Sequence, residues 1–211
     1  MNLCRVNGVI YSDEVRMKTD RIHRRPMCDL LLSAPFDHPH YKPKENYRAI
    51  MRTYVFGEDA EWLYDTISYE GAHVELRQAY LNIRYEKEKG KTHYALCNIK
   101  LDRERCGDVP DDYKPYNLCA LGGYFNNQWA SEDYEGVHRV GISMSAPPNK
   151  VFIGSKYNPI ICVWFYADQA DEIDGKLKKG DPIDYVEGVI QPWHNSERGW
   201  SVYIHATKLR V

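Results

Sequence analysis

The sequence predicts an all-β protein built from two similar halves, and three observations carry this prediction. Short apolar stretches that alternate with polar residues recur along the whole chain, and glycine or proline bounds most of them. The same succession of stretches appears twice, with a period of roughly 110 residues. Helical periodicity is limited to one short acidic segment in each half. Each half is therefore expected to form a small β-barrel.

The clearest sign of the repeat is a shared Ser-Ala-Pro motif, at 33–35 and 145–147. In each half this motif ends a predicted strand. A long loop with aromatic and basic residues follows it, and then comes an apolar strand, at 50–56 in the first half and 160–166 in the second. Long loops of this kind are often functional.

The remaining segments also correspond in order. The helix, the long fourth strand and the closing strand are expected at 58–64, 74–83 and 94–101, and again at 168–177, 183–192 and 200–209. Five strands with one helix between the third and the fourth is the order of the OB-fold, a five-stranded Greek-key barrel. We therefore expect two tandem OB-fold domains, at 1–105 and 119–211, joined by a linker at 106–118 that is rich in Gly, Pro and Asp.

The charge balance limits the kinds of partner. Lys and Arg total 28 against 30 Asp and Glu, so the net charge is −2 and binding through phosphate attraction alone is not expected. The aromatic content is more unusual, with 17 Tyr, 5 Trp and 5 Phe. Tyrosine combines a stacking ring with a polar tip, so a surface rich in it suits a flat ligand.

Several other classes of protein are not supported. No apolar run reaches the roughly 18 residues of a membrane helix and the first residues do not resemble a secretory signal, so a cytoplasmic protein without membrane contact is expected. The six cysteines include no CxxC pair, and neither a metal nor another cofactor is expected. The sequence patterns of P-loop, nucleophile-elbow, zinc-peptidase and dinucleotide sites are missing, so we do not expect an enzyme.

Short motifs in both halves resemble the bacterial single-stranded DNA-binding protein family. In the second half they are VWFYA at 163–167, LKKGD at 177–181, VEGVI at 186–190 and WSVY at 200–203; in the first half they are RVNGVI at 5–10 and DEVR at 13–16. The family carries such phrases in this order. This chain departs from the family in lacking the acidic, disordered C-terminal tail, which favours a phage or mobile-element form and puts docking of repair proteins through a tail in doubt.

The resemblance implies that aromatic residues on the third strand of each domain stack on bases. These residues are Tyr54 and Phe56 in the first half and Trp164 and Tyr166 in the second, and each pair lies on one face of its strand. The residues alone leave open that this face is simply core.

Loops and hairpins extend the expected surface. A basic run between the first two strands holds Arg16, Lys18, Arg21, Arg24 and Arg25. The loops after Ser-Ala-Pro hold Phe36, Tyr41, Lys42, Lys44 and Tyr47, and Lys150, Phe152, Lys156 and Tyr157. The fourth strands and the hairpins that follow them hold Tyr80, Tyr85, Lys87, Lys89 and Lys91, and Trp193, Arg198 and Trp200. Solvated loops, and packing of Trp193 on Trp200 across their hairpin, remain alternatives.

These observations favour a non-enzymatic protein that coats or presents single-stranded DNA in replication or recombination. The first domain is expected to hold the phosphate backbone more strongly, and the second to stack or to serve assembly. A homodimer would carry four OB domains, and replication or recombination proteins are further expected partners. Two alternatives stay open: an OB-fold replication accessory of primosome-like or strand-annealing type, and a protein- or RNA-interaction module.

Overall fold

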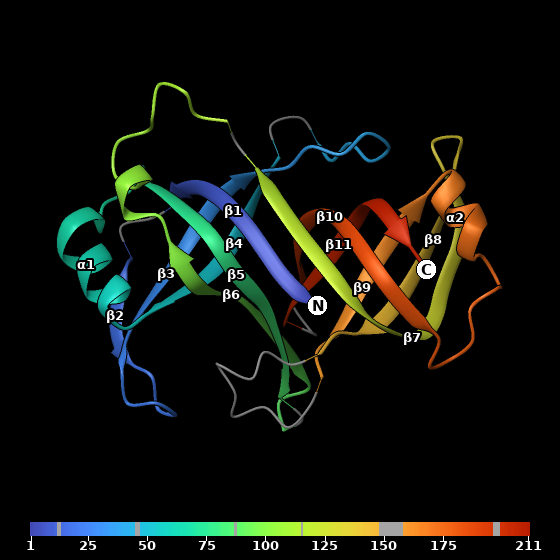
Figure 1. Ribbon diagram of the computed structural model, residues 1–211, viewed down its shortest axis with the longest axis horizontal. Helices are drawn as coiled ribbons and strands as arrows, with labels where there is room; N and C mark the ends of the chain where they lie inside the picture. The colour runs from blue at the N-terminus through green and yellow to red at the C-terminus, as the bar shows by residue number, and fades with distance from the viewer. Residues whose placement is uncertain (12–13, 45–46, 87, 115, 148–157, 196–198) are drawn as a thin grey trace.

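The computed structural model describes all of the 211 residues except 12–13, 45–46, 87, 115, 148–157 and 196–198. Two β-barrels lie side by side, each with one short helix at its outer end (Figure 1). The predicted fold class, two tandem OB-folds, is confirmed. No helix in the described part of the chain is long and apolar enough to cross a membrane.

The first barrel closes through five strands. They are β1 (Asn2–Ile10), β3 (Pro26–Pro35), β4 (Arg48–Phe56), β5 (His73–Glu86) and β6 (Lys91–Leu101), paired in the order β1–β5–β6–β4–β3–β1. Helix α1 (Glu58–Ile67) follows the third of these strands and buries Ala60, Leu63 and Ile67. A short extra strand, β2 (Arg16–Thr19), pairs with β3 and carries part of the basic run.

The second barrel repeats this order. Its strands are β7 (Asn117–Tyr134), β8 (Val137–Ser145), β9 (Ile160–Tyr166), β10 (Pro182–Asn195) and β11 (Gly199–Arg210). Pairing between β7 and β10 closes the barrel. Helix α2 (Asp168–Ile173) is shorter than the predicted 168–177, because Asp174 has an extended ψ of 115° and Gly175 adopts a left-handed φ of 66°.

The repeated Ser-Ala pair marks a close crossing of the first two barrel strands. A Cβ atom on Gly8 would lie 2.4 Å from the carbonyl oxygen of Ser33, and one on Gly123 would lie 2.1 Å from that of Ser145. Only glycine fits at these two positions without displacing the neighbouring backbone. The sequence repeat therefore reflects the same backbone contact made once in each barrel.

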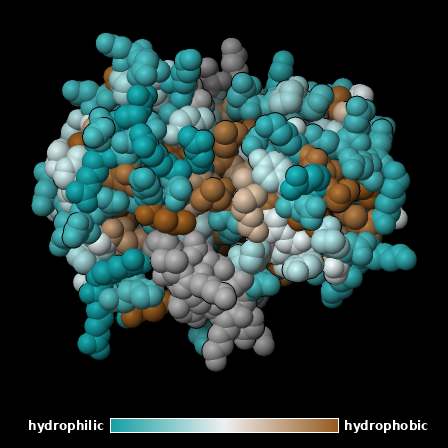
Figure 2. Space-filling model, viewed as in Figure 1, coloured by the Kyte–Doolittle hydropathy of each residue, from teal (hydrophilic) through white to brown (hydrophobic). Residues whose placement is uncertain are grey.

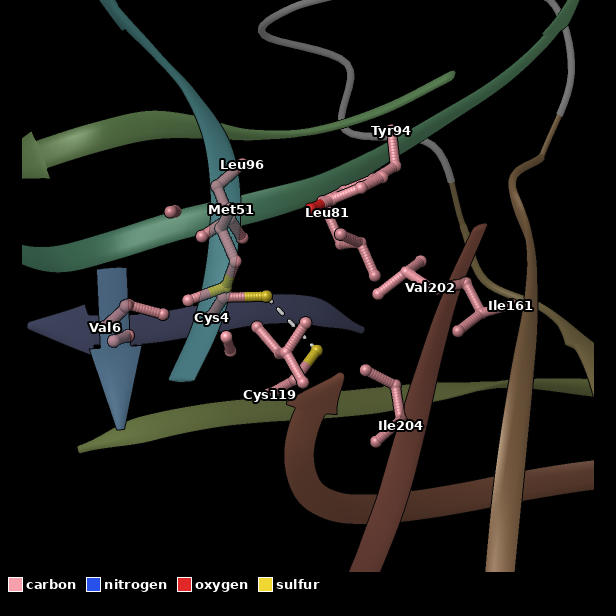
Figure 3. Close-up of a cluster of buried hydrophobic side chains, with 14 of the residues drawn as sticks. Cys4, Val6, Met51, Leu81, Tyr94, Leu96, Cys119, Ile161, Val202 and Ile204 are labelled. Carbon is pink, nitrogen blue, oxygen red and sulfur yellow. Dashed lines mark hydrogen bonds between the residues drawn. The ribbon is translucent and has the colours of Figure 1, made fainter. Parts of the chain in front are cut away.

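The two barrels are joined edge to edge by their first strands. Residues 2–6 of β1 pair antiparallel with residues 117–121 of β7, and Cys4 faces Cys119 at the centre, with their sulfur atoms 3.1 Å apart. Both thiols are fully buried, and apolar residues of both barrels, such as Leu81 and Ile204, surround them (Figure 3). Buried residues of both barrels thus belong to one continuous hydrophobic core.

Polar residues cover most of the face shown in Figure 2, and several of its apolar residues lie near the middle.

The segment between β6 and β7 is held against the first barrel. Gly107 exchanges two backbone hydrogen bonds with His73, and the side chain of Asn7 binds the carbonyl of Lys114 and the amide of Tyr116. Strand β7 already begins at Asn117, within the range expected as linker.

Replacing Gly123 by alanine should destabilise the protein by about 1–3 kcal/mol, because the new methyl group must push the Ser145 backbone away. Gly8→Ala should act alike in the first barrel. Urea denaturation measures the change. The matched control is Gly136→Asn in the β7–β8 turn, where a Cβ meets nothing within 4 Å and asparagine tolerates the φ of 79°. A loss at Gly123 no larger than in this control would contradict the crossing.

Candidate nucleic-acid interface

The third strand of the first barrel turns two aromatic rings outward. Met51, Thr53 and Val55 point into the core, while Tyr54 and Phe56 lie half-buried on the opposite face of β4. Both rings already carry a cation: the guanidinium of Arg25 lies 4.3 Å from the Phe56 ring centre, and that of Arg52 lies 5.2 Å from the Tyr54 ring centre. The chain's own arginines therefore occupy the rings expected to stack.

Tyr80 is placed beneath this face rather than on it. Its side chain is only 7% exposed and packs in a small cluster with Ala95 and Cys97, against which Tyr54 and Phe56 lie. The expectation of Tyr80 as an open stacking ring does not fit this structure, because neighbouring side chains cover it.

The basic run between the first two predicted strands contains some cations that form ion pairs and others that are exposed without one. Lys18 and Arg52 both bind the carboxylate of Asp29, at 2.5 Å and 2.7 Å. Burial alone would raise the pKa of Asp29, but the hydrogen bonds from Arg52 and Lys18 outweigh it and hold that pKa below its usual range. Arg21 and Arg24 are exposed in the turn after β2, and neither makes an ion pair within the described residues.

A first cavity of about 260 Å³ lies on this side of the first barrel. Arg16 and Arg52 line one part of it, and His93, Tyr94 and Trp200 line another. Trp200 comes from β11 of the second barrel and meets Tyr94 edge to face, with ring centres 6.1 Å apart. Glu14 and Asp29 also line the cavity and pair with these two arginines, so it combines ion pairs of one barrel with a ring of the other.

A second cavity of about 250 Å³ lies on the outer face of the second barrel and is lined mainly by rings. Trp129 from β7 meets Trp164 from β9 at 4.5 Å between ring centres and Tyr203 from β11 at 6.0 Å. Trp193 from β10 follows, 6.3 Å from Tyr203. Trp129 and Trp193 are 40% and 44% exposed, whereas Trp164 is nearly covered. Four strands thus bring four rings into one arc.

Arg139 on β8 places a positive charge under these rings. Its guanidinium lies 4.2 Å from the ring centres of both Trp164 and Tyr134, and Glu132 holds it through hydrogen bonds of 2.9 Å and 2.5 Å. Gly141, also on β8, makes room for Trp129, because a Cβ there would lie 2.6 Å from the indole ring. The arc of rings therefore depends on a glycine directly beneath it.

The loop after the first Ser-Ala-Pro crosses to the second barrel. His38 binds the carbonyl of Ala206 at 2.9 Å, and the hydroxyl of Tyr47 donates to the carbonyl of Pro192 at 3.0 Å. The ring of Tyr41 stacks on His205 with centres 4.3 Å apart and reaches the second cavity. Phe36 packs between Tyr47 and His205, while Lys42 and Lys44 stay exposed.

This loop helps to bury Tyr166, one of the rings expected to stack on bases. The ring of Tyr166 is only 2% exposed, since His38 lies over it at 4.8 Å. Its hydroxyl bonds to Nδ1 of His205 at 2.6 Å. Trp164 and Tyr166 share a strand face, as predicted, but only Trp164 borders the cavity.

The β10–β11 hairpin serves both cavities. Trp193 pairs with Ser201, and His194 pairs with Trp200, so Trp193 and Trp200 point to opposite faces of the hairpin and do not pack on each other. Trp193 enters the ring-lined second cavity, and Trp200 enters the first cavity. The two cavities therefore lie on opposite faces of this hairpin.

The other predicted residues lie elsewhere. Tyr85, Lys89 and Lys91 are exposed around the β5–β6 turn, where Lys89 pairs with Glu86 at 3.0 Å. Lys87, Lys150, Phe152, Lys156, Tyr157 and Arg198 lie outside the described residues. The described ranges contain no group of three or more His, Cys, Asp or Glu side chains that could hold a metal ion.

Several residues of the second cavity were missed from the sequence: Trp129, Arg139, Gln191, Tyr203 and His205. Two of them had a detectable signal. Tyr203 and His205 alternate with the core residues Val202 and Ile204 on the predicted closing strand, so their outward face followed from strand periodicity. Trp129 lies on β7, for which no bounds were predicted from the sequence, and its position gave no such signal.

Comparisons with known proteins agree with this architecture. Two solved structures of the single-stranded DNA-binding protein from Thermus aquaticus are similar over the whole chain: a deletion mutant, with a TM-score of 0.74 and 15% identity, and the wild type, with 0.72 and 16%. The similarity covers 100% of this chain and 93% and 92% of the two others. No family model and no curated protein sequence matches.

The chain therefore has the tandem OB-fold of those single-stranded DNA-binding proteins. The resemblance inferred from short motifs is confirmed at the level of the fold, and the similarity spans both barrels.

His205 should make the stability of the protein depend on pH. Burial is the largest cause that lowers its pKa, from 6.5 to about 3. The unfolded chain takes up this proton near pH 6.5 and the folded chain only near pH 3, so stability is greatest above pH 6.5 and falls as the pH drops through that window. The expected slope is about 1.4 kcal/mol per pH unit.

Urea denaturation between pH 7 and pH 4 measures this slope. The control is His205→Asn, which retains the acidic groups of the protein but has no ring to titrate, and its stability should fall less steeply with pH. Parallel curves for the two proteins would show that the ring is not held neutral in the fold.

Proposed function

We propose that this protein binds single-stranded DNA without catalysing a reaction, and that it coats or presents unwound strands during replication or recombination. The observation that carries the proposal is the arc of Trp164, Trp129, Tyr203 and Trp193 around one cavity on the outer face of an OB barrel. Exposed rings in such a groove stack on unpaired bases, each contributing on the order of 1–3 kcal/mol. The proteins with the same tandem fold are themselves single-stranded DNA-binding proteins by name.

The two barrels divide the work in this proposal. In the second barrel the rings Trp129 and Trp193 are open to a ligand, with Arg139 as the cation beneath their arc. In the first barrel Arg25 and Arg52 cover the corresponding rings and are themselves paired with Asp20 and Asp29, so the cations left open to phosphates on this side are Arg21 and Arg24. The second barrel therefore stacks on bases and the first holds phosphates, which accounts for affinity at a net charge of −2.

A tryptophan fluorescence titration tests the proposal with a poly-dT oligonucleotide of roughly 35 nucleotides, long enough for two OB folds at up to about 16 each. The single strand should quench strongly and duplex DNA weakly, and stronger quenching by poly-U than by poly-dT would favour the RNA-interaction alternative. Trp193→Ala should weaken binding by about 1–3 kcal/mol and leave the salt dependence unchanged, since stacking releases no counterions.

Arg21→Ala should instead flatten the salt slope by about one phosphate contact. Tyr64→Ala is the matched control for loss of an exposed ring, since Tyr64 lies 41% exposed on α1, away from both cavities. If Trp193→Ala and Trp129→Ala both bind the single strand like the unaltered protein, the second cavity is not the binding surface.

A further inference from the structure

The strand pairing that joins the two barrels places two thiols directly opposite each other. Cys4 of β1 pairs with Cys119 of β7, and the thiol of Cys4 contacts the sulfur of Cys119 at 3.1 Å. Figure 3 shows the two sulfur atoms pointing toward each other, with a dashed line between them. Each cysteine belongs to a different barrel, so a bond between them would link the two barrels covalently.

The hydrogen-bond pattern of this ladder suits such a bond. The backbone N–H of Gly122 donates to the carbonyl of Met1, which makes positions 1 and 122 a hydrogen-bonded pair. Hydrogen-bonded and non-hydrogen-bonded pairs alternate along an antiparallel ladder, so Cys4 and Cys119, three positions further on, form a non-hydrogen-bonded pair. The Cα atoms of such pairs lie about 4.5 Å apart, with their side chains close together. A disulfide accommodates Cα separations of about 4.4–6.8 Å.

The other cysteines have different neighbours across their strands. Cys28 faces Val55, and Cys97 faces Tyr80, with which it packs in a separate cluster. Cys106 and Cys162 are half-buried rather than buried. Among the strand pairings of the described residues, the pair that joins the barrels is thus the one that sets a cysteine opposite a cysteine.

We propose that Cys4 and Cys119 form a disulfide bond that locks the two barrels together when the protein meets a hydroperoxide. Sulfur atoms 3.1 Å apart need to approach by only about 1 Å to reach the length of a disulfide bond. The bond joins positions 115 residues apart, and a disulfide stabilises a protein more when the loop that it closes is long. The proposal goes beyond the proposed function and does not depend on it.

The reaction takes place in two steps. The thiolate of one cysteine attacks an oxygen atom of hydrogen peroxide, which breaks the O–O bond, leaves a sulfenic acid and releases the other oxygen as water. The thiol of the second cysteine then attacks the sulfenic sulfur and displaces its hydroxyl group as water. In total the two thiols lose two electrons and two protons, and one hydrogen peroxide becomes two molecules of water.

Burial makes this oxidation slow and its product durable. Both thiols are fully buried, and burial raises the pKa of the Cys4 thiol, so the folded protein holds little thiolate at this position. The first step therefore needs a local opening of the pairing between β1 and β7. When the pairing closes again, the sulfenic acid lies beside its partner thiol. The same burial then keeps reducing agents away from the finished bond.

Peptide mapping of the peroxide-treated protein tests the proposal. The reduced protein is exposed to hydrogen peroxide until the half-buried thiols of Cys106 and Cys162 are oxidised, and it is then unfolded, alkylated and digested. Mass spectrometry should find the peptides of Cys4 and Cys119 linked to each other. A second sample, unfolded in urea without reductant, should show a higher midpoint than the untreated protein.

Two alanine variants are matched, because each removes one buried thiol. Cys119→Ala removes the partner of Cys4, and oxidation should neither link this variant nor raise its urea midpoint. Cys97→Ala removes a buried thiol outside the pair, and oxidation should produce both the link and the rise in midpoint. Each variant is compared with its own untreated sample, so that a loss of stability from the substitution itself cancels.

The outcomes are distinct. Free Cys4 and Cys119 thiols at the end of the exposure overturn the proposal. A link from either of them to Cys28 or Cys97 also overturns it, since those thiols meet this pair only in an unfolded chain. A link between Cys4 and Cys119 that leaves the midpoint unchanged overturns the lock. None of these measurements uses DNA, so they stand apart from the test of the proposed function.

Discussion

The pairing of β1 with β7 is the constraint on which the rest of the molecule depends. Each first strand pairs with its own barrel along one edge and with the other barrel along the opposite edge, so that Cys4 and Cys119 take part in both pairings. This shared use merges two small cores into one, and a larger core buries a greater share of its apolar surface than two separate ones. It also fixes the loop around Tyr41 over the second barrel and brings Trp200 of the second barrel to the first.

The outward face of the third barrel strand is covered by different side chains in the two halves. In the first barrel the outward rings of β4 are capped by Arg25 and Arg52, which belong to the same barrel. In the second barrel the outward face of β9 is covered at Tyr166 by His38 from the other barrel, and stays accessible beside Trp164. One repeated strand pattern thus produces a charged surface in one half and an open aromatic cavity in the other.

The order of strands was predictable because it follows from local alternation, turns and a repeat whose Ser-Ala pair meets a glycine in both barrels. That Tyr54 and Phe56 share one face of their strand was predictable for the same reason, whereas the choice of that face as the outward one came from the family resemblance. The burial of Tyr166 was not, because a loop more than a hundred residues away in sequence covers it. Trp193 and Trp200 looked like partners across a hairpin, but the register opposite Ser201 and His194 sends them to opposite faces.

The contact between Cys4 and Cys119 joins equivalent positions of the repeat, 115 residues apart, so the edge between the barrels has the form of a twofold interface between two copies of one unit. Here a single polypeptide carries both copies. Their association is therefore intramolecular and does not weaken on dilution. Two separate barrels would part at low concentration, whereas one chain keeps the two cavities at a fixed spacing and lets each copy diverge on its own.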